Sequence, residues 1–483
     1  MTGTSSPEQL VGPLTAFASL PDWLAAAMQP ARVAESLVRH VPELANGRLT
    51  LLGLRPQRLR AKGSAWLARY ELRVMAAPAA EPRDVVLVGF LHPPGHGLPT
   101  GAGAGDVALG ERGWACVLPE LRLELHVQER DDALPALAKL GQPAALARLL
   151  EPVLHQAGYD EARITTCHPE VVRYKPGSRC TIVVRVDYAD GYPGPSPVVV
   201  KTHQGDKGEN AWAAMDALWQ RPETWRHAVR LAEPLAYLRE GRVLVQGPVP
   251  EELTLKELIR CVIGRGQAAD LDRLRLELTR TAYALAALHG SGASYPRTAT
   301  LQGELLEVAG VVQRLSLSVP ELAAAAEPLL SALGDGAACV AAGPVVPAHH
   351  DFRPAQVLLS GEGPGFIDFD GASMAEPALD LGRFRASLRD IGVSALSPDG
   401  EPVAAQHMQS ILPLLDDLCD HFLAEYQRHA EVSGQRVVLW ETCELLTILL
   451  HAWTKVRLHR VEPRLTVLLH QLRSRGPLPH GAG

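Results

Sequence analysis

The first clear pattern in the chain is a set of short runs rich in β-branched residues. They cover residues 170–175, 180–186 and 197–201, and Pro176-Gly177-Ser178-Arg179 joins the first two. β-Branched runs on both sides of a turn-forming segment predict a β-hairpin followed by a third strand. Residues 242–251, Arg-Val-Leu-Val-Gln-Gly-Pro-Val-Pro-Glu, indicate another strand that runs into a linker.

From about residue 270 onward the pattern becomes helical. Apolar residues recur at three- and four-residue spacing, with few β-branched runs, in residues 271–289, 301–317, 320–333, 408–429 and 440–460. A chain of 483 residues with 47% hydrophobic content can bury two or three cores. We therefore expect a sheet lobe, a helical lobe and one additional domain.

Two carboxylates lie in a short non-helical region between these helices. Asp351 is followed five positions later by Gln356 and then by an apolar strand, and Asp368 ends another apolar strand seventeen residues after Asp351. Phosphoryl transfer needs one carboxylate to orient and deprotonate an attacking hydroxyl, and an amide oxygen with a second carboxylate to hold Mg²⁺ on the nucleotide. Either Asp alone would fit a turn or a strand end, but the ordered set favours a phosphoryl-transfer site.

At these residues the chain resembles the aminoglycoside phosphotransferase-like family, the small-molecule branch of the protein-kinase-like fold. The resemblance covers roughly residues 150–475. Residues 283–289 (Tyr-Ala-Leu-Ala-Ala-Leu-His) are similar to the family's helix before the catalytic loop, and residues 375–382 to its segment after the metal-binding Asp. The resemblance implies an α+β fold with two lobes, an antiparallel β-sheet N-lobe and a helical C-lobe. The chain length leads us to expect an additional N-terminal α/β cap-like domain before them.

The resemblance also implies roles for individual residues. Asp351 would be the catalytic base, Gln356 the amide ligand of the metal, Asp368 the main Mg²⁺ carboxylate and Asp380 a residue that braces the loop. The family usually has Asn where Gln356 stands and commonly Gly where His350 stands. Gln carries the same carboxamide on one more methylene, so it offers a metal the same oxygen from a shifted position.

Lysine is scarce, with seven among 47 basic residues, and two lysines end predicted strands. Lys201 follows an apolar run, as expected of a lysine that reaches the α- and β-phosphates from a buried strand, although a solvated lysine at a strand end is the commoner case. The hairpin with Lys175, Gly177 and Arg179 would cover the phosphates. With a single glycine its backbone contacts would be partial, so Arg179 or Lys175 would supply charge; an ordinary hairpin is the equal alternative.

Two further nucleotide contacts are predicted. In the helix predicted after Gly208, Glu209 or Asp216 would form the ion pair that positions Lys201, and we prefer Glu209; either would otherwise be an ordinary surface carboxylate. By resemblance, the backbone from Gln246 to Val249 would form the hinge that meets the adenine edge.

Residues 1–150 contain a possible divergent repeat of the strand pattern around Lys201. Gly89 stands where the later copy has Lys201, so this sheet would be a cap without the phosphate-binding lysine; chance similarity between two Val-rich hairpins explains the match nearly as well. The matching segments are 58–64 with 172–178, 66–74 with 181–188, and 84–89 with 198–201. We predict an accessory domain at 1–150, the N-lobe at 151–250, the C-lobe at 251–475 and a tail at 476–483.

Composition narrows the functional class. With a net charge of −7, the sequence shows no basic stripe of the kind that binds nucleic acid. Its Arg clusters are scattered, as expected of residues on solvent-exposed surfaces. The first residues have no basic region before an apolar core, and no apolar run has membrane-spanning length. Seven dispersed cysteines without a Cys-x-x-Cys pair indicate reduced thiols and a cytoplasmic location.

These observations lead to two hypotheses. In the first, the protein is a kinase that uses Mg²⁺ and moves the γ-phosphate of ATP or GTP to a hydroxyl of a small molecule such as a sugar, an amino alcohol or an aminoglycoside. In the second, it is a catalytically inactive nucleotide-binding module that regulates a partner, because Gln356 and the glycine-poor hairpin weaken metal and phosphate handling. The sequence leaves open the acceptor, the choice between ATP and GTP, and the oligomeric state.

Overall fold

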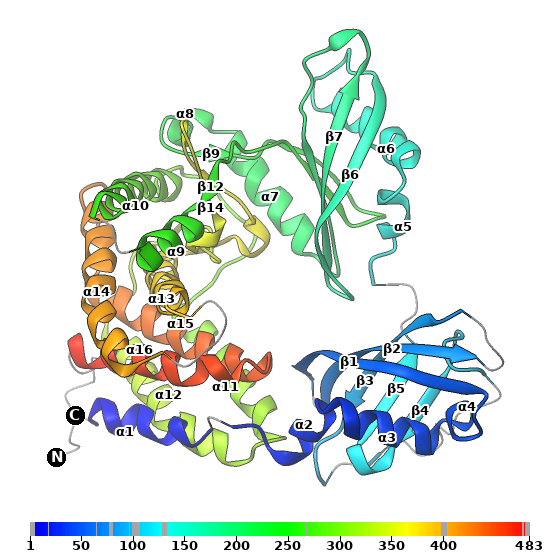
Figure 1. Cartoon of the computed structure of the whole chain (residues 1–483). Helices are drawn as coiled ribbons and strands as arrows, with labels where there is room; N and C mark the ends of the chain where they lie inside the picture. The colour runs from blue at the N-terminus through cyan, green and yellow to red at the C-terminus, as the bar shows by residue number, and fades with distance from the viewer. Residues whose placement is uncertain are drawn as a thin grey trace. The chain divides into compact units, whose positions relative to one another are not determined.

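The computed structural model describes most of the chain: residues 5–17, 19–63, 65–76, 81–95, 97–98, 107–127, 133–265, 268–397, 403–475 and 478. Its backbone divides into two compact units, whose elements are labelled in Figure 1. One unit comprises residues 1–130, 305–334 and 445–478, and the other comprises 131–304, 335–444 and 479–483. The predicted boundaries at 150, 250 and 475 stay predictions, and the predicted tail lies outside the described residues except for Leu478.

The first unit contains an antiparallel five-stranded sheet with the order β1-β2-β3-β5-β4. Alternate residues of β2 from Trp66 to Val74 are buried, as expected of a strand with one face on a core. Its strands are β1 (Leu49–Lys62), β2 (Ala65–Ala76), β3 (Arg83–Leu91), β4 (Ala115–Leu118) and β5 (Leu123–Val127). Its helices include α1 (Pro7–Val11), α2 (Asp22–Ala27), α3 (Pro30–His40), α4 (Pro42–Ala45) and α16 (Val461–Ser474).

The second unit contains a second antiparallel five-stranded sheet, with the order β6-β7-β8-β11-β10. Helix α6 (Pro143–Gln156) packs on one face, where Leu150 and Leu154 share a core with Ile182 and Val200. The strands are β6 (Ile164–Lys175), β7 (Arg179–Tyr188), β8 (Val198–His203), β10 (Pro234–Leu238) and β11 (Val243–Gln246). Helix α5 (Leu137–Leu140) precedes them, and α7 (Lys207–Trp219) and α8 (Pro222–Trp225) lie between β8 and β10.

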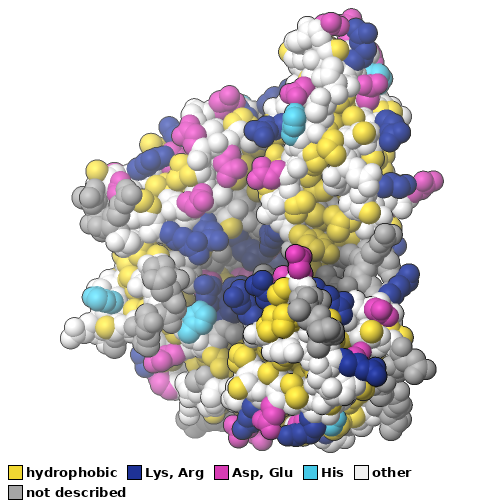
Figure 2. Space-filling model, turned by 45° about the vertical axis from the view of Figure 1, so that its right-hand side comes forward, with side chains coloured by type: hydrophobic (Ala, Val, Ile, Leu, Met, Phe, Trp, Pro, Cys, Tyr) yellow, Lys and Arg dark blue, Asp and Glu magenta, His cyan; other side chains and the backbone are white. Residues whose placement is uncertain are grey.

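The edge strand β6 is only partly covered. Val171 and Val172 are more than half exposed, at 54% and 53%. Figure 2 shows hydrophobic side chains gathered over this sheet.

The two five-stranded sheets have the same topology. Counted in chain order, both place their strands as first, second, third, fifth, fourth, and in both the preceding helix, α3 or α6, packs on the first and fourth strands. Trp66 and Cys180 are the second residues of β2 and β7, and both face a core. If these two residues are aligned, Leu67 corresponds to Thr181. Phe90, the partner of Leu67, then corresponds to Lys201, the partner of Thr181. The repeat itself stays a prediction, and in this alignment Phe90 rather than Gly89 stands at the position of the lysine.

The rest of the second unit is a helical lobe with two small sheets. Leu274, Leu278 and Leu285 lie on one buried face of α10, which confirms the helix predicted at 271–289. The small sheets have the orders β12-β14-β15-β9 and β13-β16. The helices are α9 (Leu255–Arg265), α10 (Ala268–His289), α13 (Ala378–Ala395) and α14 (Ala405–Gln427), and the strands are β9 (Arg230–Leu231), β12 (Leu253–Thr254), β13 (Val346–Ala348), β14 (Val357–Ser360), β15 (Gly363–Phe366) and β16 (Ser373–Ala375).

Three helices contribute residues to both units: α11 (Leu301–Ser316), α12 (Glu321–Cys339) and α15 (Gly434–Thr454). Among the described residues, α15 is the one helix long and apolar enough to cross a membrane, and 78% of its most apolar stretch is buried inside the protein, as in a core helix. An antiparallel sheet lobe joined to a helical lobe, with a further sheet domain before them, confirms the predicted α+β fold.

Candidate active site

The predicted catalytic base lies in the loop after β13. The guanidinium of Arg353 pairs with the carboxylate of Asp351, and Gln356 Nε2 lies 3.4 Å from Asp351 Oδ2. Burial alone would raise the pKa of Asp351, but the charge and hydrogen bond of Arg353, with the charge of Arg383, outweigh burial and hold the pKa below its ordinary value. Asp351 is therefore a carboxylate at neutral pH, and its side chain keeps 32% exposure.

Asp380, on helix α13, is hydrogen-bonded to the loop that carries Asp351. It is fully buried, accepts a hydrogen bond from the backbone N–H of His349 at 2.7 Å, and contacts His289 Nε2 at 3.1 Å. Burial alone would raise the pKa of Asp380, but the hydrogen bond and charge of His289 lower it. The contact agrees with the bracing role that the resemblance implies.

The predicted metal carboxylate lies just after β15. Asp368 has a left-handed backbone conformation (φ 73°) and its carboxylate meets Lys201 Nζ at 3.4 Å and Arg179 Nη1 at 3.4 and 3.5 Å. The loops of Asp351 and Asp368 are joined directly, since His349 Nε2 contacts the Ile367 carbonyl at 2.9 Å. The structure thus brings the sheet residues Lys201 and Arg179 to the same loops that carry both carboxylates.

Asp370 forms a second cluster of polar contacts beside Asp368, and this cluster was not predicted from the sequence. Asp370 Oδ2 contacts His203 Nε2 and Arg179 Nη1, each at 3.0 Å, and Asn210 Nδ2 donates to the Asp370 and Ala372 carbonyls at 3.3 and 3.0 Å. Burial alone would raise the pKa of Asp370, but His203, Lys201 and Arg179 hold it well below its ordinary value. The available signals were the second Asp of Asp368-Phe369-Asp370 and the two-residue spacing from Lys201 to His203 along one strand.

Strands β6 and β7 form the hairpin that was predicted to cover the phosphates. Gly177 takes a left-handed conformation (φ 65°) in the turn between β6 and β7, which suits glycine. Arg179 reaches Asp368 and Asp370, while Lys175 ends β6 at the turn. The structure thus places Arg179 on the carboxylates.

The ion pair predicted between Glu209 and Lys201 is wrong for this structure. Glu209 pairs with Arg239 at 2.7 Å and is 38% exposed, and Lys201 pairs with Asp368 instead. On helix α7 the next residue, Asn210, is the one that faces inward, since it is 5% exposed.

The predicted hinge residues lie on the link between the sheet and the helical lobe. Gln246 ends β11, is buried, and pairs with Val199 and Pro234 on the neighbouring strands. Val249 packs so closely on Gly365 of β15 that a Cβ there would lie 2.3 Å from Val249 Cγ1. A glycine at 365 is therefore needed for this approach, and contact with adenine stays a prediction.

The residues around Asp368 suit a magnesium ion held jointly with a nucleotide. Asp370 Oδ1 is buried without a hydrogen-bond partner, and Gln356 adds an amide near Asp351. In the described part of the chain, no group of three or more His, Cys, Asp or Glu side chains is arranged to hold a metal on its own. Mg²⁺ in nucleotide sites needs only one or two carboxylates beside substrate phosphates, so this set fits.

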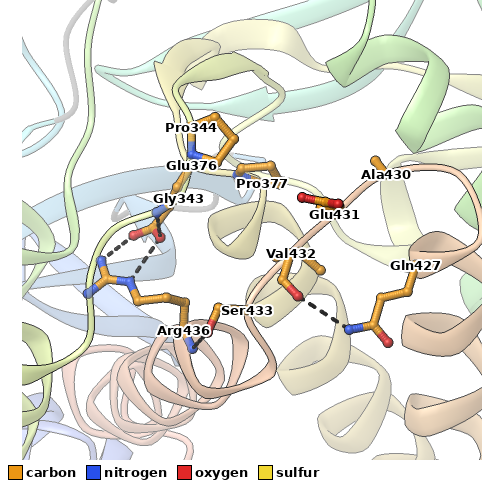
Figure 3. A pocket seen from close by; sticks show the side chains of 10 residues that line it. All are labelled: Gly343, Pro344, Glu376, Pro377, Gln427, Ala430, Glu431, Val432, Ser433 and Arg436. Atoms are coloured by element: carbon orange, nitrogen blue, oxygen red, sulfur yellow. Dashed lines mark hydrogen bonds and ion pairs between the residues drawn. The ribbon is translucent and has the colours of Figure 1, made fainter.

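A pocket of about 500 Å³ lies elsewhere in the helical lobe (Figure 3). Its buried Glu376 binds Arg436 Nε at 2.9 Å, Trp440 Nε1 at 2.7 Å and the Gly343 N–H at 3.2 Å. Burial alone would raise the pKa of Glu376, but Arg436 and Trp440 lower it. The remaining lining residues are Pro344, Pro377, Gln427, Ala430, Glu431, Val432 and Ser433. The chain itself thus supplies hydrogen-bond partners for both Glu376 and Arg436 at this pocket.

Comparison with known proteins finds a family-model match for part of the chain. The family model of the phosphotransferase enzyme family matches residues 226–400, which confirms the resemblance for the segment that carries Asp351 and Asp368. No curated protein matches the sequence.

Several solved structures are similar at low identity. A choline/ethanolamine kinase family protein from Mesorhizobium loti is 16% identical, with 63% of this chain and 88% of that chain covered and a TM-score of 0.42. Choline kinase LicA from Streptococcus pneumoniae is 13% identical, with 68% and 99% covered and a TM-score of 0.42. A glucosamine kinase, in complex with glucosamine, ADP and inorganic phosphate, is 18% identical, with 92% and 99% covered and a TM-score of 0.42. The fold assignment rests on the sheet topology and the family match.

Proposed function

We propose that the protein is a small-molecule kinase that transfers the γ-phosphoryl group of ATP or GTP to a hydroxyl of a sugar, an amino alcohol or an aminoglycoside-like acceptor. One observation carries the proposal: Lys201 of the sheet meets Asp368 at 3.4 Å, and the loop of Asp368 is bonded to the loop of Asp351. The phosphotransferase family match over residues 226–400 agrees with this arrangement.

On the acceptor side, Asp351 is the catalytic base. Its carboxylate orients the acceptor hydroxyl and takes its proton as the hydroxyl oxygen bonds to the γ-phosphorus, and the bond from that phosphorus to the β–γ bridging oxygen breaks. The charge of Arg353, which pairs with Asp351, keeps this base ionised at neutral pH.

On the nucleotide side, charge and backbone contacts are divided among several elements. Lys201 binds the α- and β-phosphates, Arg179 adds a second cation, and Lys175 and Gly177 form the covering turn. Backbone groups from Gln246 to Val249 meet the adenine edge.

Asp368 and Gln356 would hold Mg²⁺, which neutralises phosphate charge when the nucleotide is bound. We further propose a cytoplasmic enzyme that acts without nucleic acid or membrane partners.

The test is a screen of purified protein against hydroxyl-bearing metabolites with Mg²⁺ and ATP or GTP, in which nucleoside diphosphate release is measured. At least one acceptor should stimulate release, and mass spectrometry should find that acceptor phosphorylated. Asp351→Ala should lower the rate by about 10²–10⁴-fold. Nucleotide binding without transfer to any acceptor would overturn the kinase proposal and favour the inactive module, for which Gln356 is the motivating residue.

A further inference from the structure

His350, directly before the catalytic base, has an unusual backbone conformation. Its φ of 68° lies in the left-handed region, where a residue with a Cβ is disfavoured relative to glycine. Such a conformation persists only where surrounding contacts hold it. The contacts of His350 are therefore the interactions that hold this backbone conformation in place.

The imidazole joins the base loop to the loop of Asp368. Its Nδ1 contacts Ser373 Oγ at 2.9 Å, and its ring lies over Gly371, where an added Cβ would be 3.5 Å from His350 Cδ2. Gly371 directly follows the carboxylate segment 368–370, and Ser373 lies two residues further on. One side chain thus connects the residue that would serve the acceptor with the segment that would serve the nucleotide.

The other ring nitrogen and the backbone of His350 are tied to one ion pair. His350 Nε2 contacts Glu304 Oε1 at 3.2 Å, and Arg383 Nη1 donates to the His350 carbonyl at 2.7 Å. Arg383 also pairs with Glu304, and its Nε lies 3.5 Å from Glu444. Burial alone would lower the pKa of Arg383, but Glu444 and Glu304 outweigh burial, so the guanidinium stays charged.

We propose that His350 is a positioning residue, which, supported by Glu304 and Arg383, fixes Asp351 relative to the loop of Asp368. The inference rests on the proposed kinase function. Its physical basis is that phosphoryl transfer depends on alignment of base, acceptor and phosphate, and a displacement of about 1 Å costs up to about 10²-fold in rate.

The test uses His350→Gly, because glycine adopts a φ of 68° without a Cβ. We expect the melting temperature to stay within a few degrees of wild type, the KM for nucleotide to change less than about twofold, and kcat to fall by about 10- to 100-fold. His350→Asn, which tolerates the left-handed region and keeps a hydrogen-bonding side chain, should recover part of kcat.

The matched control is Arg242→Gly, because Arg242 is an exposed residue that also has a positive φ (49°) in the same unit. It should leave kcat, KM and melting temperature unchanged. A wild-type kcat in His350→Gly would overturn the positioning role alone, and so would a kcat loss that follows an equal loss of folded protein. Absence of transfer by the wild-type protein would remove the proposed function, and the inference with it.

Discussion

A buried charge triad in the helical lobe allows a sharp prediction for Glu441→Gln. Glu441 on α15 accepts one hydrogen bond from Arg385 Nε and one from Arg389 Nε, both at 2.7 Å, and all three side chains are at most 1% exposed. Glutamine keeps the size of the side chain and removes its charge. Two buried guanidinium groups then lose their shared counter-ion while α13, which also carries Asp380 and Arg383, keeps its packing.

The expected loss can be worked from the pKa of Glu441. Burial alone would raise this pKa from its ordinary 4.5, but Arg385 and Arg389 lower it to about 2. The interval 4.5 − 2 = 2.5 corresponds to about 3 kcal/mol of folding free energy. Removing one partner of a buried pair typically costs about 3–5 kcal/mol, which agrees. Because the folded-state pKa is the lower one, the contribution is complete above pH 4.5 and is lost as the pH falls toward 2.

The assay is urea unfolding followed by circular dichroism at pH 7 and pH 3. The free energy of unfolding of Glu441→Gln should be about 3 kcal/mol below that of wild type at pH 7. At pH 3 the difference should be only about 1 kcal/mol, because protonation of Glu441 in the unfolded chain already removes most of its stabilising contribution in wild type. Glu431→Gln, the same change at an exposed site, should stay within about 0.5 kcal/mol at both pH values. A loss below about 1 kcal/mol at pH 7, or an equal loss at both pH values, would refute the reasoning.

Three further predictions concern the active site. Arg353→Gln removes the charge that lowers the pKa of Asp351, so the acid limb of the pH profile of kcat/KM should move to higher pH; an unmoved limb would show that Asp351 is not the titrating base. Gln356→Ala should raise the Mg²⁺ concentration for half-maximal activity by about 10-fold, and an unchanged Mg²⁺ requirement would exclude Gln356 as a ligand. Lys201→Met should weaken nucleotide binding by about 10- to 100-fold in calorimetry, and wild-type affinity would contradict its phosphate-binding role.

The sequence predicted the parts of the site that follow from local patterns. The spacing from Asp351 to Gln356 and Asp368, between apolar strands, was enough to place these residues on adjacent loops. Lys201 could be predicted to enter from the sheet because an apolar run precedes it. The helix at 271–289 followed from apolar residues at three- and four-residue spacing.

The predictions from the sequence failed where the outcome depends on which side of a helix a residue faces, or on contacts between residues far apart in the chain. A helix turns by about 100° per residue, so the pattern around α7 did not show that Asn210 rather than Glu209 faces inward. The pairing of His203 with Asp370 joins residues far apart in the chain, so the local spacing of each one did not show that the two side chains meet. Packing of 305–334 and 445–478 with the first 130 residues has no local signal either.

The central claim is that the two carboxylates do different work: Asp351 serves the acceptor and Asp368 serves the metal and nucleotide. The most direct measurement is calorimetry with Mg²⁺ and a nonhydrolysable nucleotide on Asp351→Asn and Asp368→Asn, beside a transfer assay with an acceptor from the screen. Asp351→Asn should bind nucleotide as wild type does and transfer phosphate about 10²–10⁴-fold more slowly, whereas Asp368→Asn should lose Mg²⁺-dependent binding. Wild-type turnover in Asp351→Asn, or unchanged Mg²⁺-dependent binding in Asp368→Asn, would contradict this division of roles.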